Sequence, residues 1–249
     1  RGLSRFPELD TRTSPLTLSI LSTLTAVAIS TFVALTVDVF SWDVDFTQWL
    51  QGFTLGEARF LRGWIFWMGV RGVAGAVLVV VFGALWLKRQ RLEAVSLGLI
   101  SIPDLFNILL REIIGRPRPT ADLVDVLIGY GGVQGNSFPS GHALHALLFY
   151  GLLMYLAARY IPNRPQVGVI WALGTVYILV SGLWLIYDGR HWFTDVMGGY
   201  MYGALYLLVL IAAYKWAKER VRRNEHLRLS RLAPRPLRKP TESLLRLLG

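Results

Sequence analysis

The sequence lacks cysteine and is poor in charged residues. Without cysteine, the chain can form neither a disulfide framework nor a thiolate metal site. Charged residues make up 17% of the chain, whereas a soluble domain typically has about 25%. Because hydrophobic residues make up 53%, the shortage of charge argues against an ordinary soluble domain and favours a membrane protein.

Long apolar runs recur along the chain. A run of about twenty apolar residues can cross a bilayer as a helix. Six such segments are present, at roughly 16–37, 64–87, 92–114, 143–160, 167–187 and 192–216. They predict an all-α fold, a six-transmembrane helical bundle formed by one membrane domain over residues 16–216. The first run is too long for a signal-peptide core and lacks a small-residue cleavage site, so we expect it to be retained.

Acidic residues are also scarce, and the basic residues are unevenly distributed. With residues 1–15 placed inside, nineteen of the 26 Lys and Arg fall in inner segments, and eleven of these lie from residue 215 onward. Positive residues favour the cytoplasmic side, so we expect both termini, the segment 1–15 and a basic tail 217–249, to be cytoplasmic. The chain would then be a multi-pass protein of the plasma (inner) membrane, with its tail on anionic headgroups. This explains the net charge of +10 without nucleic acid as a partner.

Residues 38–63 are too polar to cross a membrane. Large apolar residues recur in this segment at helical spacing: Trp42, Phe46, Trp49, Leu50 and Phe53. The pattern predicts an interfacial amphipathic helix between spans one and two, with aromatic rings at headgroup level. A simple re-entry loop with aromatic anchors would give much the same pattern.

Ser140, Gly141 and His142 follow Pro139 at the start of the fourth apolar segment. Proline suits a first helical turn, and glycine lets a ligand approach the backbone closely. The free N–H groups of that helix start, together with the Ser140 hydroxyl, would form an anion site. His142 beside it could donate a proton to a leaving oxygen. An ordinary helix start with an interfacial histidine would contain the same residues.

His191 and Asp195 lie four residues apart at the start of the sixth segment and would share a helix face. A carboxylate hydrogen-bonded to one ring nitrogen, at about 2.6–3.2 Å, fixes the tautomer and leaves the other nitrogen as a nucleophile. A purely structural His–Asp pair at a helix end is the alternative. A metal site is disfavoured, because so few histidines without a carboxylate cluster make a poor zinc set. We therefore expect no metal and no cofactor.

Arg111, Arg116 and Arg118 cluster at the end of the third segment, on the less basic side. Planar guanidinium groups bind phosphate oxygens bidentately. The cluster therefore predicts an anionic partner, either a lipid headgroup or a phosphorylated substrate. Asp104 and Asn107 are polar residues at membrane depth and should face the bundle interior, where they would support the site or pack helices.

In combination, these segments resemble the type 2 phosphatidic acid phosphatase family, in its integral-membrane lipid phosphatase branch. Three motifs carry the resemblance: Arg111-x6-Arg118-Pro119, Phe138-Pro-Ser-Gly-His142 and Tyr187-x-Gly-x-His191-x3-Asp195. Their order, their spacings and their positions at the ends of spans three, four and six match the family. The likeness covers roughly residues 40–216.

The resemblance implies catalysis through a phosphohistidine intermediate without a metal. It implies that His191 is the nucleophile, that Asp195 orients it, and that His142 is the general acid. The residues implied to bind the phosphoryl oxygens are Arg118, Ser140 and Gly141. The substrate would be a lipid phosphate.

Two positions depart from the family pattern. The first motif usually opens with lysine, and here Arg111 keeps the charge. The third motif usually carries Ser-Arg at the positions that hold Trp184 and Leu185 in this chain. Loss of one donor to developing charge commonly costs about 10²–10³ in rate. Arg190 and Arg116 are the candidate replacements for binding the phosphate.

The sequence thus predicts a membrane lipid phosphatase that hydrolyses a lipid phosphate or pyrophosphate at the outer leaflet, on the non-cytoplasmic face. Two alternatives stay open. A lipid phosphotransferase would use the same histidine intermediate. A catalytically impaired phosphatase-like scaffold, or an accessory subunit of a larger membrane complex, is favoured by Leu185. The six apolar segments exclude a soluble haloperoxidase, and a transporter has only their number in its favour.

Overall fold

The computed structural model of the protein describes residues 14–53, 73–127 and 135–232. Within these ranges every regular element is helical, which confirms the predicted all-α class. The elements are α1 (Pro15–Thr36), α2 (Ser41–Gln51), α4 (Val73–Leu87), α5 (Arg91–Gly98), the 3₁₀ turn η2 (Leu99–Ser101), α6 (Ile102–Ile114), α7 (Gly141–Tyr160), α8 (Arg164–Tyr187) and α9 (Phe193–Leu232).

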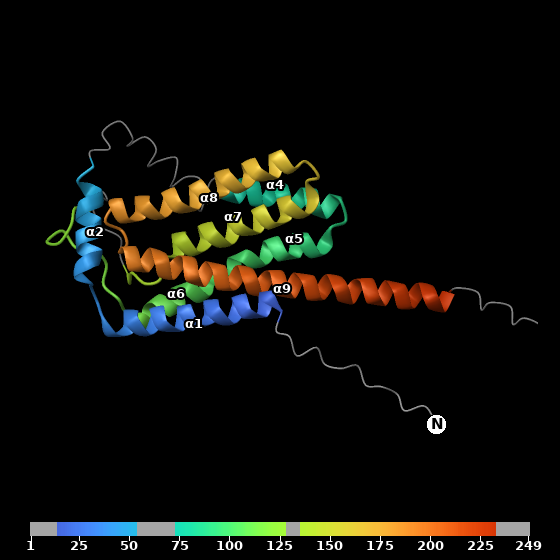
Figure 1. The fold of residues 1–249 in the computed structure, drawn as a ribbon, viewed down its shortest axis with the longest axis horizontal. Coiled ribbons are helices and arrows are strands. Elements are labelled where there is room, and N and C mark those ends of the chain that lie inside the picture. Colours follow the sequence, from blue (N-terminus) through green and yellow to red (C-terminus); the bar gives the residue numbers. More distant parts are fainter. Residues whose placement is uncertain (1–13, 54–72, 128–134, 233–249) are drawn as a thin grey trace, which may run out of the picture.

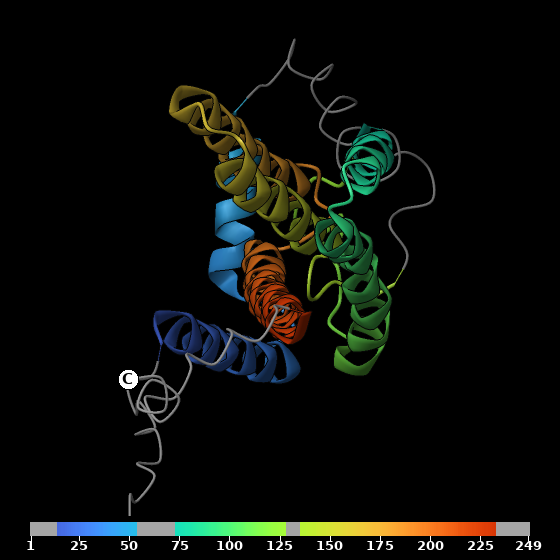
Figure 2. The same cartoon turned by 90° about the vertical axis from the view of Figure 1, so that its right-hand side faces the viewer.

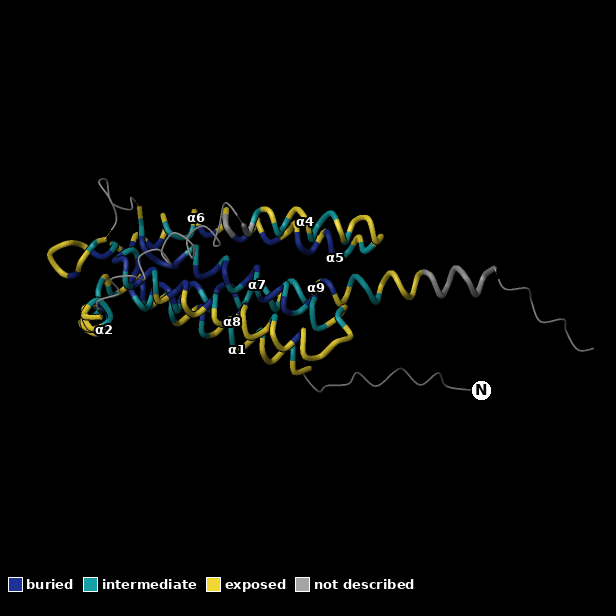
Figure 3. The backbone as a smooth tube through the Cα atoms, turned by 90° about the horizontal axis from the view of Figure 1, so that it is seen from above, coloured by how far each residue is buried: buried dark blue, intermediate teal, exposed yellow. Residues whose placement is uncertain are grey.

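The long helices lie side by side, and the short helix α2 crosses one end of the bundle (Figure 1). We call this end the α2 end. The helix α7 is central, because it packs against both α8 and α9, while α1 packs against α9. The end-on view of Figure 2 shows α9 between α1 and the α7–α8 pair. Figure 3 shows that few residues of α7 are exposed, whereas α1 is mostly exposed.

Five helical segments are long and apolar enough to cross a membrane: Pro15–Thr36, Arg91–Ile114, Gly141–Tyr160, Arg164–Tyr187 and Phe193–Asn224. They coincide with five of the six predicted spans. The remaining span, predicted at 64–87, lies partly outside the described residues, and α4 is its described part. The presence of six spans therefore stays a prediction. Large apolar side chains such as Phe32, Leu173 and Ile113 are exposed on the outside of the bundle, as expected for surfaces that face lipid.

The third span is not one continuous α-helix. It is formed by α5, the turn η2 and α6. Pro103 is the second residue of α6, where its missing N–H costs little because the first N–H groups of a helix have no partner inside it. After this 3₁₀ turn, α6 runs to the α2 end (Figure 1). Arg111 lies in the last turn of α6.

The predicted amphipathic helix is present as α2, but its inward face carries polar as well as apolar residues. Asp43 and Thr47 are fully buried, whereas Trp42 and Trp49 are about half exposed. Phe46, which was predicted to anchor at headgroup level, packs inward against Phe193. The apolar spacing therefore located this helix correctly, and it gave no sign that an aspartate would face the protein interior.

The last helix is longer than the predicted sixth span. α9 has 40 residues and continues past residue 216 into the predicted basic tail. In this part, Glu219 pairs with Arg222 and Arg223, each at 3.0 Å. The start of α1 and the end of α9 both lie at the end of the bundle opposite α2 (Figure 1).

Candidate active site

The three motif segments meet at the α2 end of the bundle. α6 and α8 end there, and α7 and α9 begin there (Figure 1). Because the motifs occupy these four helix ends, residues up to eighty positions apart come together. The predicted arginines, histidines and aspartate therefore belong to one site.

A tight turn between α8 and α9 positions His191. Gly189 has a left-handed backbone (φ 65°), and a Cβ atom there would collide with the carbonyl oxygen of Asp125. The backbone N–H groups of Arg190 and His191 both donate to the carbonyl of Leu185, at 3.0 and 3.3 Å. The turn is therefore fixed by backbone bonds, and it directs the His191 ring into the bundle.

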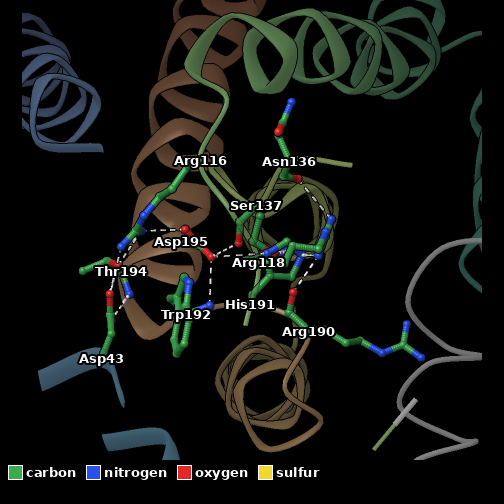
Figure 4. Close-up of polar contacts among 12 residues, drawn as sticks. Asp43, Arg116, Arg118, Asn136, Ser137, Arg190, His191, Trp192, Thr194 and Asp195 are labelled. Carbon is green, nitrogen blue, oxygen red and sulfur yellow. Dashed lines mark hydrogen bonds and ion pairs between the residues drawn. The ribbon is translucent and has the colours of Figure 1, made fainter. Parts of the chain in front are cut away.

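The His191 ring lies between an arginine and a carboxylate (Figure 4). Its Nε2 is 3.3 Å from Nη1 of Arg118, and its Nδ1 is 3.6 Å from Oδ2 of Asp195. The latter distance is longer than the hydrogen bond that we expected. The ring is 2% exposed. Burial lowers the pKa of His191, with Asp195 acting against this shift, so the neutral imidazole is favoured at neutral pH.

Asp195 is fully buried and surrounded by donors. Its Oδ2 accepts from the Ser137 hydroxyl and from the Trp192 N–H (2.8 Å). Its Oδ1 accepts from Nη1 of Arg116 at 2.7 Å. These charge-assisted bonds stabilise the ionised carboxylate and hold it beside the His191 ring.

Arg118 is held by backbone carbonyls. Its Nη1 donates to the carbonyl of Arg190 at 2.6 Å, its Nη2 to that of Asn136 at 3.2 Å, and its Nε to that of Gly135 at 3.0 Å. Burial, followed by the charge of Arg111, lowers the pKa of Arg118 to about 10, so it stays charged at neutral pH. A fixed and partly desolvated cation therefore lies next to His191 Nε2.

The start of α7 closes another side of the site. Ser140 is fully buried and caps the helix, since its Oγ accepts from the Ala143 N–H at 3.4 Å. The Asn107 amide packs on the backbone of Gly141, only 2.8 Å from where a Cβ would lie. Asn107 is 3% exposed, and its Oδ1 has no hydrogen-bond partner among the described residues. Polar groups thus border the predicted anion site at this helix start.

His142 and Arg111 complete the group of predicted residues. His142 is half-buried and interacts electrostatically with His191, Arg190 and Arg111. Arg111 also acts on His191 and Arg118. His142 on α7 and Arg111 on α6 are therefore both close enough to the His191 ring to interact with it electrostatically.

The two candidate replacement arginines have different surroundings. Arg190 Nε lies 3.3 Å from Asp188 Oδ2, and its side chain points away from His191 (Figure 4). Arg116 is 1% exposed and pairs with two carboxylates, Asp43 at 3.0 Å and Asp195 at 2.7 Å. Figure 4 shows Arg116 and His191 on opposite sides of the Asp195 carboxylate. The guanidinium of Arg116 is thus engaged by the protein itself.

Leu185, which occupies the position of the family's motif arginine, belongs to an apolar contact. It is 6% exposed and packs in a cluster with Ala143, Val196 and Phe46. The neighbouring Trp184 is turned elsewhere, and its buried Nε1 has no hydrogen-bond partner among the described residues. Position 185 therefore lies in a hydrophobic contact between α7, α8, α9 and α2.

Sequence reasoning missed three polar residues of the site: Asp43, Ser137 and Thr194. The serine directly precedes Phe138 of the second motif, so its position was a usable signal. Asp43 lies in a segment that resembled a surface helix and gave no such signal. In the part of the chain that the structure describes, no three His, Asp or Glu side chains are grouped so as to hold a metal ion.

Known proteins resemble this chain in sequence and in fold. The family model of the PAP2 superfamily matches residues 93–219. Phosphatidylglycerophosphatase B of Bacillus subtilis (strain 168) is 31% identical over 151 residues, which are 59% of this chain and 68% of that protein. The crystal structure of a transmembrane PAP2 type phosphatidylglycerolphosphate phosphatase from Bacillus subtilis matches with a TM-score of 0.69 and 21% identity, over 79% of this chain and 96% of that chain. This last likeness is one of fold.

Proposed function

Because the chain belongs to the PAP2 superfamily, we propose that this integral membrane protein is a phosphatase that releases phosphate from a membrane lipid. The resemblance read from three short motifs is confirmed at the level of the family. The name of the similar Bacillus protein makes phosphatidylglycerophosphate the first substrate to test. Other lipid monophosphates and lipid pyrophosphates are further candidates.

The observation that carries the proposal is the environment of His191. A buried, neutral imidazole has one nitrogen toward Asp195 (3.6 Å) and the other beside Arg118 (3.3 Å). Nε2 is the nitrogen beside the cation, so it is the one that would attack a phosphorus atom held by that cation. A histidine that served only to join two helices would not need a charged guanidinium next to its second nitrogen.

The reaction would proceed in two steps. In the first, His191 Nε2 attacks phosphorus, the bond from phosphorus to the lipid oxygen breaks, and His142 donates a proton to that oxygen. Asp195 stabilises the positive charge of the phosphorylated ring. In the second, water attacks the phosphohistidine, His142 takes up a proton from it, and the nitrogen–phosphorus bond breaks to release phosphate. This sequence needs no metal.

The phosphoryl oxygens would be bound by Arg118, Arg111 and the start of α7. Ser140 and Gly141 contribute the polar groups of a helix N-terminus, where an anion is favoured. These groups act on charge that develops during transfer, so they lower the barrier as well as bind substrate.

Arg190 is our candidate for the arginine that position 185 lacks. It directly precedes the nucleophile and acts electrostatically on His142 and Arg118. To reach a phosphate it would have to turn from its partner Asp188. Arg116, the other candidate, is engaged by Asp43 and Asp195, which supports a role through Asp195 in place of phosphate binding.

The membrane orientation is part of the proposal. The site is at the α2 end, and the start of α1 and the basic end of α9 are at the opposite end. Since basic residues favour the cytoplasm, the site would open to the non-cytoplasmic face of the plasma membrane, with lipid as its partner. Anionic headgroups would receive the basic tail.

A catalytically impaired scaffold is the second candidate, favoured by the packing of Leu185. A phosphotransferase is the third, since a lipid hydroxyl could replace water in the second step. The test is phosphate release from a panel of lipid phosphates by purified protein, beside His191→Ala. Turnover by the wild type alone would support the phosphatase. Equal, background-level release by both proteins would favour the scaffold, and phosphorylated acceptor lipid without free phosphate would favour the transferase.

A further inference from the structure

We infer that Asp43 of α2 is a positioning residue for the reaction, acting on the nucleophile through Arg116 and Asp195. The inference rests on the proposed function and extends it to a helix outside the three motifs. We call the four residues that carry it, Asp43, Arg116, Thr194 and Asp195, the carboxylate–arginine cluster. Figure 4 shows them as a continuous chain of contacts that ends at His191.

The cluster is built around a shared cation. Arg116 Nη2 donates to Oδ2 of Asp43 at 3.0 Å, and its Nη1 donates to Oδ1 of Asp195 at 2.7 Å. The side chains are 1% exposed for the arginine and 0% for both carboxylates. Charges this deeply buried interact strongly because water does not screen them. Removing the charge of one of these side chains therefore changes the electrostatic energy of the other two.

Asp43 also binds the first turn of α9, which carries Asp195. Its Oδ1 accepts from the Thr194 N–H at 3.0 Å, and its Oδ2 accepts from the Thr194 hydroxyl. Arg116 Nη1 donates to that hydroxyl oxygen at 2.6 Å. One carboxylate of α2 thus holds both the guanidinium and the helix turn next to the nucleophile.

The charges of the cluster match the demand of the first step. Two carboxylates and one guanidinium leave it negative overall, and His191 becomes positive when it is phosphorylated. The charge of Arg116 is divided between the carboxylates of Asp43 and Asp195. Arg116 therefore neutralises Asp195 only in part, and Asp195 can still stabilise a positive charge on the His191 ring. Without the negative charge of Asp43, Arg116 would pair with Asp195 alone. The His191 ring would then lose part of its stabilisation in the transition state.

A purely structural role for Asp43 makes a different prediction. As a helix cap and ion-pair partner, it would stabilise the fold, and its loss would lower the melting temperature without a specific effect on kcat. The electrostatic role predicts an effect on kcat that depends on whether the charge of Arg116 is also removed. The two roles can therefore be separated with four variants.

The first comparison is Asp43→Asn against Asp45→Asn. Asp45 is on the same helix and exposed, so it is a matched control for loss of one negative charge. The assay is phosphate release from phosphatidylglycerophosphate in detergent micelles. Asp43→Asn should lower kcat about 10-fold or more, the loss typical of a group that orients a reactive residue through hydrogen bonds without touching the substrate. KM should change little, because Asp43 does not touch substrate. Asp45→Asn should behave as the wild type.

The second comparison measures Arg116→Gln alone and combined with Asp43→Asn in a double variant. This double variant removes one charge of each sign, so the cluster again carries the negative charge of Asp195 alone. Its kcat should exceed that of Asp43→Asn, although it has lost more hydrogen bonds. Losses that simply add would overturn the inference, because independent structural contacts give additive effects. Thermal melting of each variant shows whether it has folded.

The remaining outcomes are also informative. If Asp43→Asn does not fold, the double variant decides alone: activity within about 10-fold of wild type would support the inference, and activity as low as that of His191→Ala would overturn it. An active wild type with Asp43→Asn equal to Asp45→Asn would overturn the inference and leave the proposed function intact. A wild type as inactive as His191→Ala would overturn the proposed function, and the inference with it.

Discussion

The backbone N–H of Ser140 donates to the backbone carbonyl of Asp195 at 3.0 Å. This bond ties the start of α7 to the first turn of α9. It therefore fixes the predicted phosphate-binding residues relative to the carboxylate beside His191, the proposed nucleophile. Because the hydrogen bond joins backbone atoms, the side chains of the site could move without changing how the two helix starts are placed.

The close approach of α7 and α9 at this point gives the first prediction. A Cβ on Gly199 would lie 2.5 Å from the Ser140 carbonyl oxygen and 3.0 Å from the Ala143 Cβ. Gly199→Ala should therefore push the two helices apart, destabilise the protein by about 1–3 kcal/mol, and reduce phosphate release. Thermal melting in detergent and activity would measure this. Gly168→Ala on α8 is the control, since its Cβ would meet nothing within 4 Å.

The two histidines should differ in their kinetic effects. His191→Ala should abolish turnover, because no phosphoenzyme can form. His142→Ala should slow phosphoenzyme formation, and should do so least for lipid pyrophosphates, whose leaving group needs little protonation. Single-turnover kinetics with a monophosphate and a pyrophosphate substrate would test this. Equal losses with both substrates would contradict a general-acid role.

Position 185 offers a test of how the site binds phosphate. If Arg190 has replaced the missing arginine, Arg190→Ala should lower kcat about 10²-fold or more. Leu185→Arg should then gain nothing, and should destabilise the protein by placing a cation among Ala143, Val196 and Phe46. A gain of activity in Leu185→Arg, together with a nearly inactive wild type, would instead identify an impaired site.

The pH dependence follows from the state of His191. Its pKa lies below the usual 6.5 because of burial, with the charge of Arg118 acting in the same direction. The neutral ring is the reactive form of His191, so protonation of His191 should lower kcat/KM on the acid side, below pH 6.5. Loss of the proton from the general acid His142 should lower kcat/KM separately, on the alkaline side. Arg118→Gln removes a charge that lowers this pKa, so the acid limb should move to higher pH. A pH–rate series of the two proteins measures the shift, and an acid limb that moves to lower pH in the variant would refute it.

Chelation tests the absence of a metal from the chemistry. The proposed steps use protein side chains and water and no metal ion, so EDTA should leave the rate of phosphate release unchanged. The rate should also not respond to added Mg²⁺ or Zn²⁺. Strong inhibition by EDTA, reversed by one of these ions, would contradict the phosphohistidine route as written.

Much of the fold was predictable, because a bilayer requires long apolar runs. Five of the six runs correspond to helices of suitable length. The break in the third span was not predicted, although Pro103 is visible in the sequence. Proline occurs in transmembrane helices as well as at their starts, so its effect depends on how neighbouring helices pack.

The site was predictable where local spacing determines it, or where the family resemblance implies a residue, as for Arg118 and His142. His191 and Asp195 are close because they are only four residues apart. The predicted shared helix face is wrong, however, because α9 begins at Phe193 and His191 lies in the turn before it.

Arg116 and Arg118 are separated by one residue, yet they lie on opposite sides of Asp195. The side of Asp195 on which each arginine lies is set by partners such as Asp43, which is 73 positions before Arg116. No local pattern encodes such a partner.

The continuity of α9 links the site to the far end of the molecule. A helix of 40 residues is about 60 Å long, twice the thickness of a bilayer core of about 30 Å. Because its first turn is held at Asp195, the direction in which each later side chain points is determined there. Inserting one residue after Trp216 would rotate Arg220 and Arg223 by about 100° around the helix axis and leave the first turn in place. The direction in which these basic side chains point from the helix is therefore set by the contacts of Asp195, about 60 Å of helix away at most.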